Sequence, residues 1–144
     1  MDDLILVGAG GCMREILWQI EELNKRRPTW NVLGIVDKES NGQINNIHGY
    51  PVLGDDNYLI NYKNDINVAI CIGSSLLRKK IATKLAANPF ISFPNLLADD
   101  VKIADSSIIG KGCFIGTNSV ISVDAVLEDF VFINIGSLIS HDCR

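Results

Sequence analysis

A row of branched aliphatic residues recurs at every sixth position in the second half of the chain. The row is Leu97, Ile103, Ile109, Ile115, Ile121, Leu127, Ile133 and Ile139. Four positions after each member stands a small or modest residue, in the set Val101, Ser107, Cys113, Ser119, Ala125, Val131, Ser137 and Cys143. A period of six fits neither an α-helix nor an alternating strand, but it fits parallel β-coils in which like side chains stack. The pattern therefore predicts a parallel β-helix in this half of the chain.

The first half of the chain alternates short apolar runs with stretches of helical spacing. The predicted strands are 4–7, 32–36, 68–72 and 90–93, and the predicted helices are 12–27, 56–62 and 75–87. In the last of these helices, Leu76, Leu77, Ile81 and Leu85 are expected to face inward, with Arg78, Lys79, Lys80 and Lys84 toward water. Strands linked by right-handed helical crossovers form a parallel sheet, so we expect an α/β domain with a Rossmann-like arrangement.

Two segments of the first half carry no regular periodicity. Residues 38–46 are rich in Asn, Gly and Ser and are predicted to form an exposed loop. Residues 49–55 are predicted to be an irregular connection rather than a strand, because Pro51 and two glycines interrupt them. With Pro94 and Asn95 as the joint, we expect an α/β domain at 1–94 and a β-helix at 95–144.

Composition and charge exclude several classes of protein. The net charge is −4 and the basic residues cluster only in the triplets 25–27 and 78–80, so nucleic acid is a poor partner. The chain begins Met1-Asp2-Asp3 without the basic and apolar segments of a signal peptide, and it has no apolar run of membrane-spanning length. We therefore expect a cytoplasmic protein whose four scattered cysteines are buried free thiols, with no metal site.

Glycines follow the first predicted strand and open the first helix. The run Gly8-Ala9-Gly10-Gly11 allows backbone N–H groups at a helix N-terminus to face a phosphate. A dinucleotide fingerprint needs G-x-G-x-x-G, and Met13 stands where its third glycine would be. A phosphate or nucleotide site is therefore favoured over a nicotinamide site, and a merely structural turn is the alternative.

Polar residues also stand at the ends of the next two parallel strands. Asp37 ends the second strand, where an acidic residue commonly accepts hydrogen bonds from a ribose; the alternative is an exposed turn aspartate. Gly73 and Ser74 stand at the end of the third strand, so three strand ends could line one crevice.

His141 lies near the end of the sixfold pattern. The inward rows belong to Ile139 and Cys143, so His141 turns either toward one of these rows or outward at a corner. Asp142 follows directly and could orient the imidazole, although neighbouring side chains on extended backbone usually point apart. The other histidine, His48, is expected to be a surface residue.

The chain resembles the bacterial sugar O- and N-acetyltransferases of the NeuD/PglD type. The resemblance rests on motifs in a specific order: the glycine run with Arg14-Glu15, the segment 49–55, Ile72-Gly73-Ser74 with Arg78-Lys79, the hexapeptide rows, and His141-Asp142-Cys143. It implies an α/β Rossmann-like N-terminal domain followed by an incomplete left-handed parallel β-helix of hexapeptide repeats.

The resemblance also implies a function and its residues. In this family the N-terminal domain holds a nucleotide-linked sugar, the β-helix trimerises, and acetyl-CoA lies between neighbouring prisms. A histidine matching His141 would be the general base and Asp142 would orient it. The residues implied to bind the nucleotide-linked amino sugar or sialic acid are Gly10, Gly11, Asp37, Lys38, Gly73 and Ser74.

Several features depart from the family pattern. Cys12-Met13 follows the glycine run where family members have His or Phe and then Gly, and Phe93-Pro94 stands where they commonly have His-Pro. At three hexapeptides per coil, 97–144 makes under three coils, so we expect a truncated β-helix, a homotrimer only at full length, and most of the acetyl-CoA surface in later coils. Two alternatives are a non-enzymatic nucleotide-sugar-binding module and an NAD-dependent oxidoreductase.

Overall fold

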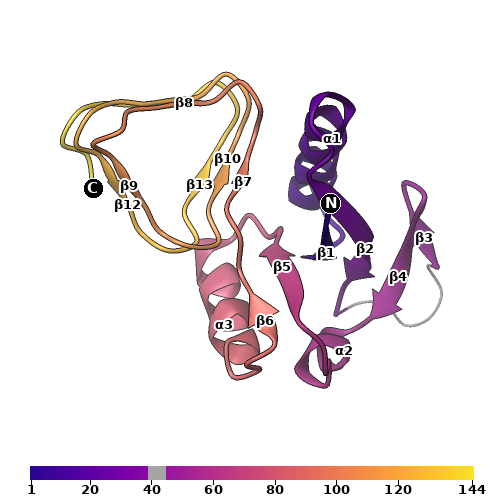
Figure 1. Ribbon diagram of the computed structural model, residues 1–144. Helices are drawn as coiled ribbons and strands as arrows, with labels where there is room; N and C mark the ends of the chain where they lie inside the picture. The colour runs from indigo at the N-terminus through magenta and orange to yellow at the C-terminus, as the bar shows by residue number, and fades with distance from the viewer. Residues whose placement is uncertain (39–44) are drawn as a thin grey trace.

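The first half of the chain folds into a six-stranded sheet in the order β3-β4-β2-β1-β5-β6 (Figure 1). The computed structural model describes residues 1–38 and 45–144, so most of the loop predicted at 38–46 lies outside the described residues. The strands are β1 (Asp2–Val7), β2 (Trp30–Val36), β3 (Asn46–Ile47), β4 (Tyr50–Gly54), β5 (Ile66–Ile70) and β6 (Ile91–Ser92). All neighbours pair in parallel except β3 with β4, as the alternating pattern predicts for a Rossmann-like domain.

The connections of this sheet create a topological switch point between β1 and β5. From β1 the chain moves outward to β2 and β4, and it then returns to add β5 on the other side of β1. In open α/β sheets, ligands bind outside the carboxyl ends of the strands at such a point.

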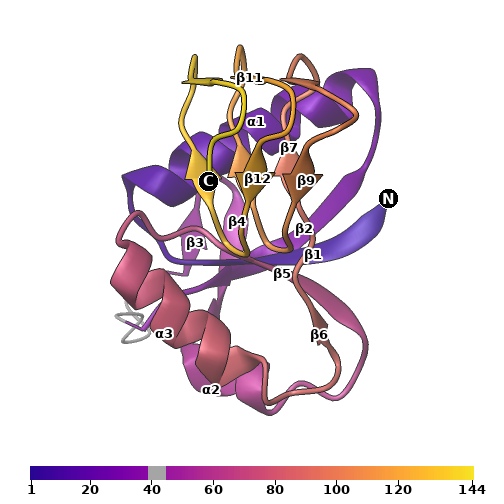
Figure 2. The ribbon, with the colours of Figure 1, turned by 90° about the vertical axis from the view of Figure 1, so that its left-hand side faces the viewer.

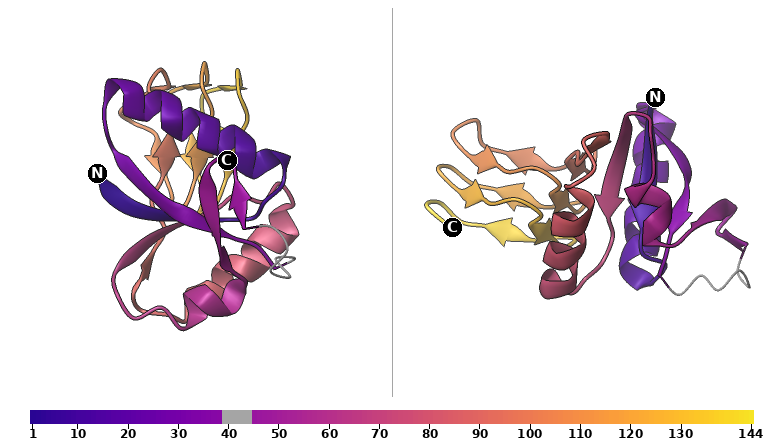
Figure 3. Two further views of the ribbon diagram at one scale, coloured as in Figure 1. Left: turned by 90° about the vertical axis from the view of Figure 1, so that its right-hand side faces the viewer. Right: turned by 90° about the horizontal axis from the view of Figure 1, so that it is seen from below.

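Helices cover both faces of the sheet (Figure 3). The helices are α1 (Gly11–Arg26), α2 (Asp56–Ile60) and α3 (Ser75–Leu85). Helix α1 packs Met13, Ile16 and Ile20 against Leu4 and Leu6 of β1 on one face. On the other face, α2 and α3 pack against the opposite side chains of β1 and β5, in a cluster that includes Ile5, Val7, Val68, Leu59 and Ile81. The alternation of side chains along β1 therefore serves both layers of the core.

The second half of the chain is an incomplete β-helix of eight two-residue strands. They are β7 (Leu96–Leu97), β8 (Lys102–Ile103), β9 (Ile108–Ile109), β10 (Phe114–Ile115), β11 (Val120–Ile121), β12 (Val126–Leu127), β13 (Phe132–Ile133) and β14 (Leu138–Ile139). They stack into three parallel sheets, β13-β10-β7, β14-β11-β8 and β12-β9, which form the sides of a triangle in Figure 1 and the stacked coils in Figure 2. Ile115 thus pairs with Leu97 and Ile133, and the row that recurs every sixth residue fills the interior from Ile103 onward, while Leu97 at its start is exposed.

The corners of the β-helix use left-handed backbone. Positive φ recurs every six residues, at Gly112 (66°), Asn118 (58°), Asp124 (58°), Phe130 (60°), Gly136 (69°) and Asp142 (58°). Glycine, Asn and Asp adopt this conformation at low cost, but a bulky aromatic residue does not, so Phe130 is the unusual corner.

One side of the β-helix packs on the α1 face of the sheet. Leu96 and Phe114, from β7 and β10, belong to the same buried cluster as Leu4 and Ile16. Figure 1 shows this side of the triangle turned toward α1. A partly buried hydrogen bond crosses the same interface, because the backbone N–H of Thr117 donates to the side-chain oxygen of Gln19 at 2.8 Å.

Two sequence predictions about the first half are wrong. Residues 50–54 form strand β4 rather than an irregular connection, because Gly34 of β2 has no Cβ: one built there would stand 2.6 Å from the carbonyl oxygen of Pro51. In α3, Leu76 was predicted to face inward and is 82% exposed, and Arg78 was predicted to face water and is only 7% exposed. Arg78 is buried because backbone carbonyl groups surround its guanidinium, as described below.

Among the described residues, no helix combines the length and apolar character that crossing a membrane requires.

Candidate functional site

A cavity of about 410 Å³ lies at the switch point of the sheet. Its walls come from the loops that follow β1, β2 and β5 and from the start of α2 and α3. It is lined by Val7, Gly8, Ala9, Gly10, Gly11, Cys12, Asp37, Lys38, Asp56, Cys71, Ile72, Gly73, Leu77 and Ile81. Five of the six residues implied to bind the sugar nucleotide therefore share one crevice, and we call it the switch-point cavity.

The glycine loop forms one end of this cavity. Gly8 has φ of +106°, and a Cβ there would stand 3.0 Å from the carbonyl oxygen of Cys71, so only glycine fits this turn. Gly10 caps α1 without any side-chain hydrogen bond, and the first turn of the helix carries no acidic residue. Among the residues that the structure describes, the first N–H groups of α1 therefore have no side-chain partner at this end of the cavity, which is the arrangement that binds anions.

Charged side chains line the opposite side of the switch-point cavity. Asp37 follows β2, and its backbone N–H donates to the carbonyl oxygen of Gly54 at 3.0 Å, which fixes its position beside β4. Lys38 follows it and is exposed. Asp56 opens α2 and accepts a hydrogen bond from the ammonium of Lys84 at 3.1 Å. This part of the lining therefore contains two carboxylates and one ammonium.

The β5–α3 loop closes the third side of the cavity. Gly73 lines it, whereas Ser74 does not. The hydroxyl oxygen of Ser74 instead accepts a hydrogen bond from the backbone N–H of Leu77 at 3.4 Å, so the side chain caps α3. The structure gives Ser74 a structural position next to the cavity and leaves its implied contact with the sugar a prediction.

Two cysteines lie at the floor of the cavity. Burial raises the pKa of both Cys12 and Cys71, so neither thiol is activated as a nucleophile. All four cysteines are free, but only Cys71 and Cys113 are buried; Cys12 is partly buried and Cys143 is exposed, so the prediction of burial is wrong for these two. Across residues 1–38 and 45–144, no group of three or more His, Cys, Asp or Glu side chains could hold a metal ion.

His141 and Asp142 occupy a corner of the last coil, with side chains 71% and 75% exposed. Left-handed backbone at Asp142 bends the chain, and this bend brings the Nδ1 of His141 within 2.8 Å of the Asp142 carboxylate. Adjacent side chains therefore meet here because the backbone is a turn rather than an extended strand. Neither residue lines the switch-point cavity, so the two predicted halves of the site stand apart within one chain.

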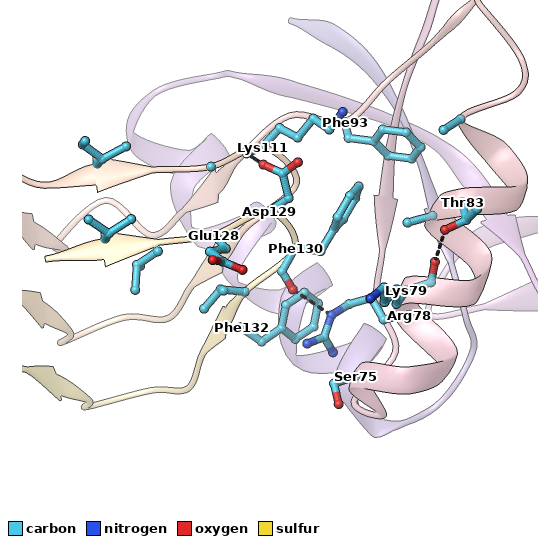
Figure 4. A pocket seen from close by; sticks show the side chains of 17 residues that line it. Ser75, Arg78, Lys79, Thr83, Phe93, Lys111, Glu128, Asp129, Phe130 and Phe132 are labelled. Carbon is cyan, nitrogen blue, oxygen red and sulfur yellow. Dashed lines mark hydrogen bonds between the residues drawn. The ribbon is translucent and has the colours of Figure 1, made fainter. Parts of the chain in front are cut away.

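A second, larger cavity of about 1070 Å³ lies between α3 and the β9-β12 side of the β-helix. Figure 4 shows Arg78 and Lys79 on the α3 side of the cavity, with Phe130 and Phe132 beside the guanidinium and Phe93 farther along the wall. We call it the interdomain cavity. The β5–α3 loop and α3 thus separate two cavities, and Arg78 stands between them.

Asp56 and Arg78 are candidate functional residues that sequence reasoning missed. Asp56 follows β4, which was not predicted as a strand, so its place at the carboxyl edge of the sheet was not recognised. Arg78 was assigned to the solvent face by its charge alone. Arg78 belongs to one of the motifs of the family resemblance, but its burial leaves no signal in the sequence, because its partners are backbone carbonyl groups.

Comparisons with known proteins agree with this architecture. Residues 3–85 match the family described as the PglD N-terminal domain. Among curated proteins, no sequence matches the chain.

Solved structures extend the similarity to the β-helix. The acetyltransferase domain of PglB from Neisseria gonorrhoeae, in complex with acetyl coenzyme A, is 26% identical with a TM-score of 0.81 over 98% of this chain. PerB from Caulobacter crescentus, in complex with CoA and GDP-perosamine, is 27% identical with a TM-score of 0.83 over 100% of this chain. WeeI from Acinetobacter baumannii, 22% identical with a TM-score of 0.83 over 99% of this chain, shows the same fold.

The chain spans about two thirds of the length of these structures: 65% of the PglB domain and of PerB, and 66% of WeeI. The family match covers 3–85 and includes all of β1 except its first residue, the glycine loop, Asp37, β4 and the whole of α3. The chain belongs to the PglD N-terminal domain family, and it carries the Rossmann-like domain of that family in front of an incomplete β-helix.

Proposed function

We propose that this chain is part of an acetyltransferase that moves the acetyl group of acetyl-CoA to a nucleotide-linked amino sugar or sialic acid. The observation that carries the proposal is the switch-point cavity, which joins Gly10, Gly11, Asp37, Lys38 and Gly73. The similarity to PglB with acetyl coenzyme A and to PerB with CoA and GDP-perosamine supports both substrate classes.

The strand order suggests how the nucleotide sugar lies in the cavity. The diphosphate would meet the N-terminus of α1 at Gly10 and Gly11, because N–H groups and the helix dipole favour negative charge there. The ribose would reach Asp37 after β2, and the sugar would extend past Gly73 after β5. Lys38 would neutralise part of the phosphate charge.

His141 is the proposed general base. It would remove a proton from the acceptor amine or hydroxyl as that group attacks the carbonyl carbon of the thioester, and the sulfur of CoA would leave. In the tautomer that donates from Nδ1 to Asp142, the Nε2 of His141 is free to take the proton. Asp142 would thus hold the ring orientation and stabilise the imidazolium once it forms.

A homotrimer is part of the proposal. His141 does not line the switch-point cavity of its own chain, so an arrangement of several chains can bring a base and a sugar together. The implied trimer would also place acetyl-CoA between neighbouring β-helices.

A binding module without catalysis is the second candidate, because His141 and the cavity stand apart in one chain. The nicotinamide alternative is disfavoured by Met13 of α1, whose side chain is fully buried against β1 at the position where the dinucleotide motif has glycine.

Two measurements test the proposal. Calorimetric titration of the 144-residue chain with UDP- and GDP-linked amino sugars and with NAD is expected to give binding only with the nucleotide sugars. Release of CoA from acetyl-CoA, followed with a thiol reagent, is expected to require the same nucleotide sugar in the chain or in a longer polypeptide that contains it. Binding without CoA release in either would favour the binding module, and binding of NAD alone would overturn the proposal.

A further inference from the structure

Arg78 is a buried cation on α3 whose partners are neutral. Its side chain is 7% exposed, and none of the ion pairs among the described residues includes it. A buried charge without a carboxylate is costly unless hydrogen bonds satisfy it. The position of Arg78 therefore needs an explanation in its hydrogen bonds.

One end of the guanidinium holds the wall of the switch-point cavity. The Nη1 group donates to the carbonyl oxygens of Ile72 at 2.7 Å and Gly73 at 3.2 Å. Both residues line the switch-point cavity, and Gly73, without a side chain, cannot be held by packing. Arg78 thus fixes the orientation of two peptide groups at the edge of the cavity.

The rest of the guanidinium holds the β-helix. Its Nε donates to the carbonyl oxygen of Phe130 at 2.9 Å, and its central carbon stands 4.0 Å from the ring centroid of Phe132 (Figure 4). Phe130 is the bulky corner with φ of +60°, and its ring contacts Phe93 edge to face at 5.1 Å. An unfavourable backbone conformation persists only where its surroundings hold it.

We propose that Arg78 is a positioning residue: it fastens the β5–α3 loop of the nucleotide-sugar site to the first coils of the β-helix and so sets the shape of the cavity wall. The identity of the ligand rests on the proposed function, whereas the fastening of the loop does not.

Removal of the Arg78 guanidinium would affect the three carbonyl groups that it binds. Without the guanidinium, the oxygens of Ile72, Gly73 and Phe130 lose their charged donor, and the loop gains conformations in which Gly73 no longer faces the ligand. A hydrogen bond to a charged group contributes enough that its loss should weaken nucleotide-sugar binding about tenfold.

Three variants separate the hydrogen-bonding geometry of the guanidinium from its charge. Arg78→Met removes the cation. Arg78→Lys keeps the charge but loses the separate N–H donors that bond to the β5–α3 loop and to the β-helix at the same time. Lys79→Met is the matched control, because it removes a neighbouring exposed cation that lines only the interdomain cavity. We expect Arg78→Lys and Arg78→Met to lose affinity alike, and Lys79→Met to bind as the wild type does.

A ligand-free readout distinguishes this inference from the proposed function. Amide hydrogen exchange of the 144-residue chain is expected to accelerate at least tenfold over 71–77 in both Arg78 variants, and to stay unchanged there in Lys79→Met. Unchanged exchange over 71–77 would overturn the positioning role even if the variants lost overall stability. Faster exchange in the Arg78 variants, combined with a wild-type chain that binds no nucleotide sugar, would count against the proposed function only.

Phe132→Leu covers the case in which the Arg78 variants do not fold. It removes the aromatic face beneath the guanidinium and leaves the three hydrogen bonds possible. We expect exchange over 71–77 to rise about threefold in this variant. Exchange that rises only in the β-helix would contradict the proposal.

Discussion

Gly11→Asp separates ligand binding from stability at the glycine loop. Gly11 is the first residue of α1, it is exposed, and it lines the switch-point cavity. Across the described residues, a Cβ built on it meets only the Nη2 of Arg14, at 3.8 Å, so an added side chain fits there without moving the backbone. The substitution therefore changes the charge of the loop rather than its fold.

The expected loss of affinity follows from the charges. Two unit charges about 4 Å apart repel by about 1 kcal/mol in water and by about 4 kcal/mol near a protein surface. Because Gly11 is exposed and the cation of Arg14 is close, we expect an intermediate repulsion of about 2 kcal/mol between the new carboxylate and the ligand phosphate. This energy raises the dissociation constant of a nucleotide sugar about thirtyfold. The new carboxylate should also interact favourably with the helix dipole, so the melting temperature should stay level or rise.

The assay is calorimetric titration of a UDP- or GDP-linked amino sugar, with thermal unfolding measured in parallel. Gly11→Asn is the control, because its side chain has the same size and no charge, and it should bind within about threefold of the wild type. Equal losses in both variants would mean that size rather than charge matters. Unaltered affinity in Gly11→Asp would place the phosphate elsewhere.

Three further substitutions test other parts of the structure. His141→Ala should lower acetyl transfer at least about a hundredfold and leave nucleotide-sugar affinity intact, and unchanged turnover would remove this histidine from the mechanism. Gly8→Ala should destabilise the fold by about 1–3 kcal/mol in urea unfolding, because its φ of +106° suits only glycine; a neutral effect would refute that turn. Hydrogen bonds from Thr117 lower the pKa of Asp100, so stability should fall as pH drops below the ordinary 3.8, and Asp100→Asn should flatten this pH dependence.

The sixfold row predicted the β-helix well because its periodicity is local and repeats along the chain. Each hexapeptide carries its own inward residue, as Ile115 and Ile121 do, and the coils stack these residues in one cluster. Strand β4 was missed because Pro51 interrupts the pattern, while the feature that admits the strand is Gly34 in a different segment.

The candidate site was predictable where it follows strand ends. Gly10, Asp37 and Gly73 line the same cavity because parallel strands bring their carboxyl ends to one edge of the sheet. Arg78 was not predictable, since its partner Phe130 is 52 residues away and contributes only a backbone oxygen. The sequence shows that Arg78 is charged, but it does not show which backbone carbonyl groups will lack a hydrogen-bond donor in the folded chain.

The position of a nucleotide sugar tests the central claim most directly. Backbone amide shifts of the 144-residue chain can be followed by NMR during titration with a UDP- or GDP-linked amino sugar. The account predicts the largest changes at Gly10, Gly11, Asp37 and Gly73, around the switch-point cavity. Changes confined to the interdomain cavity, or no changes at saturating nucleotide sugar, would contradict it.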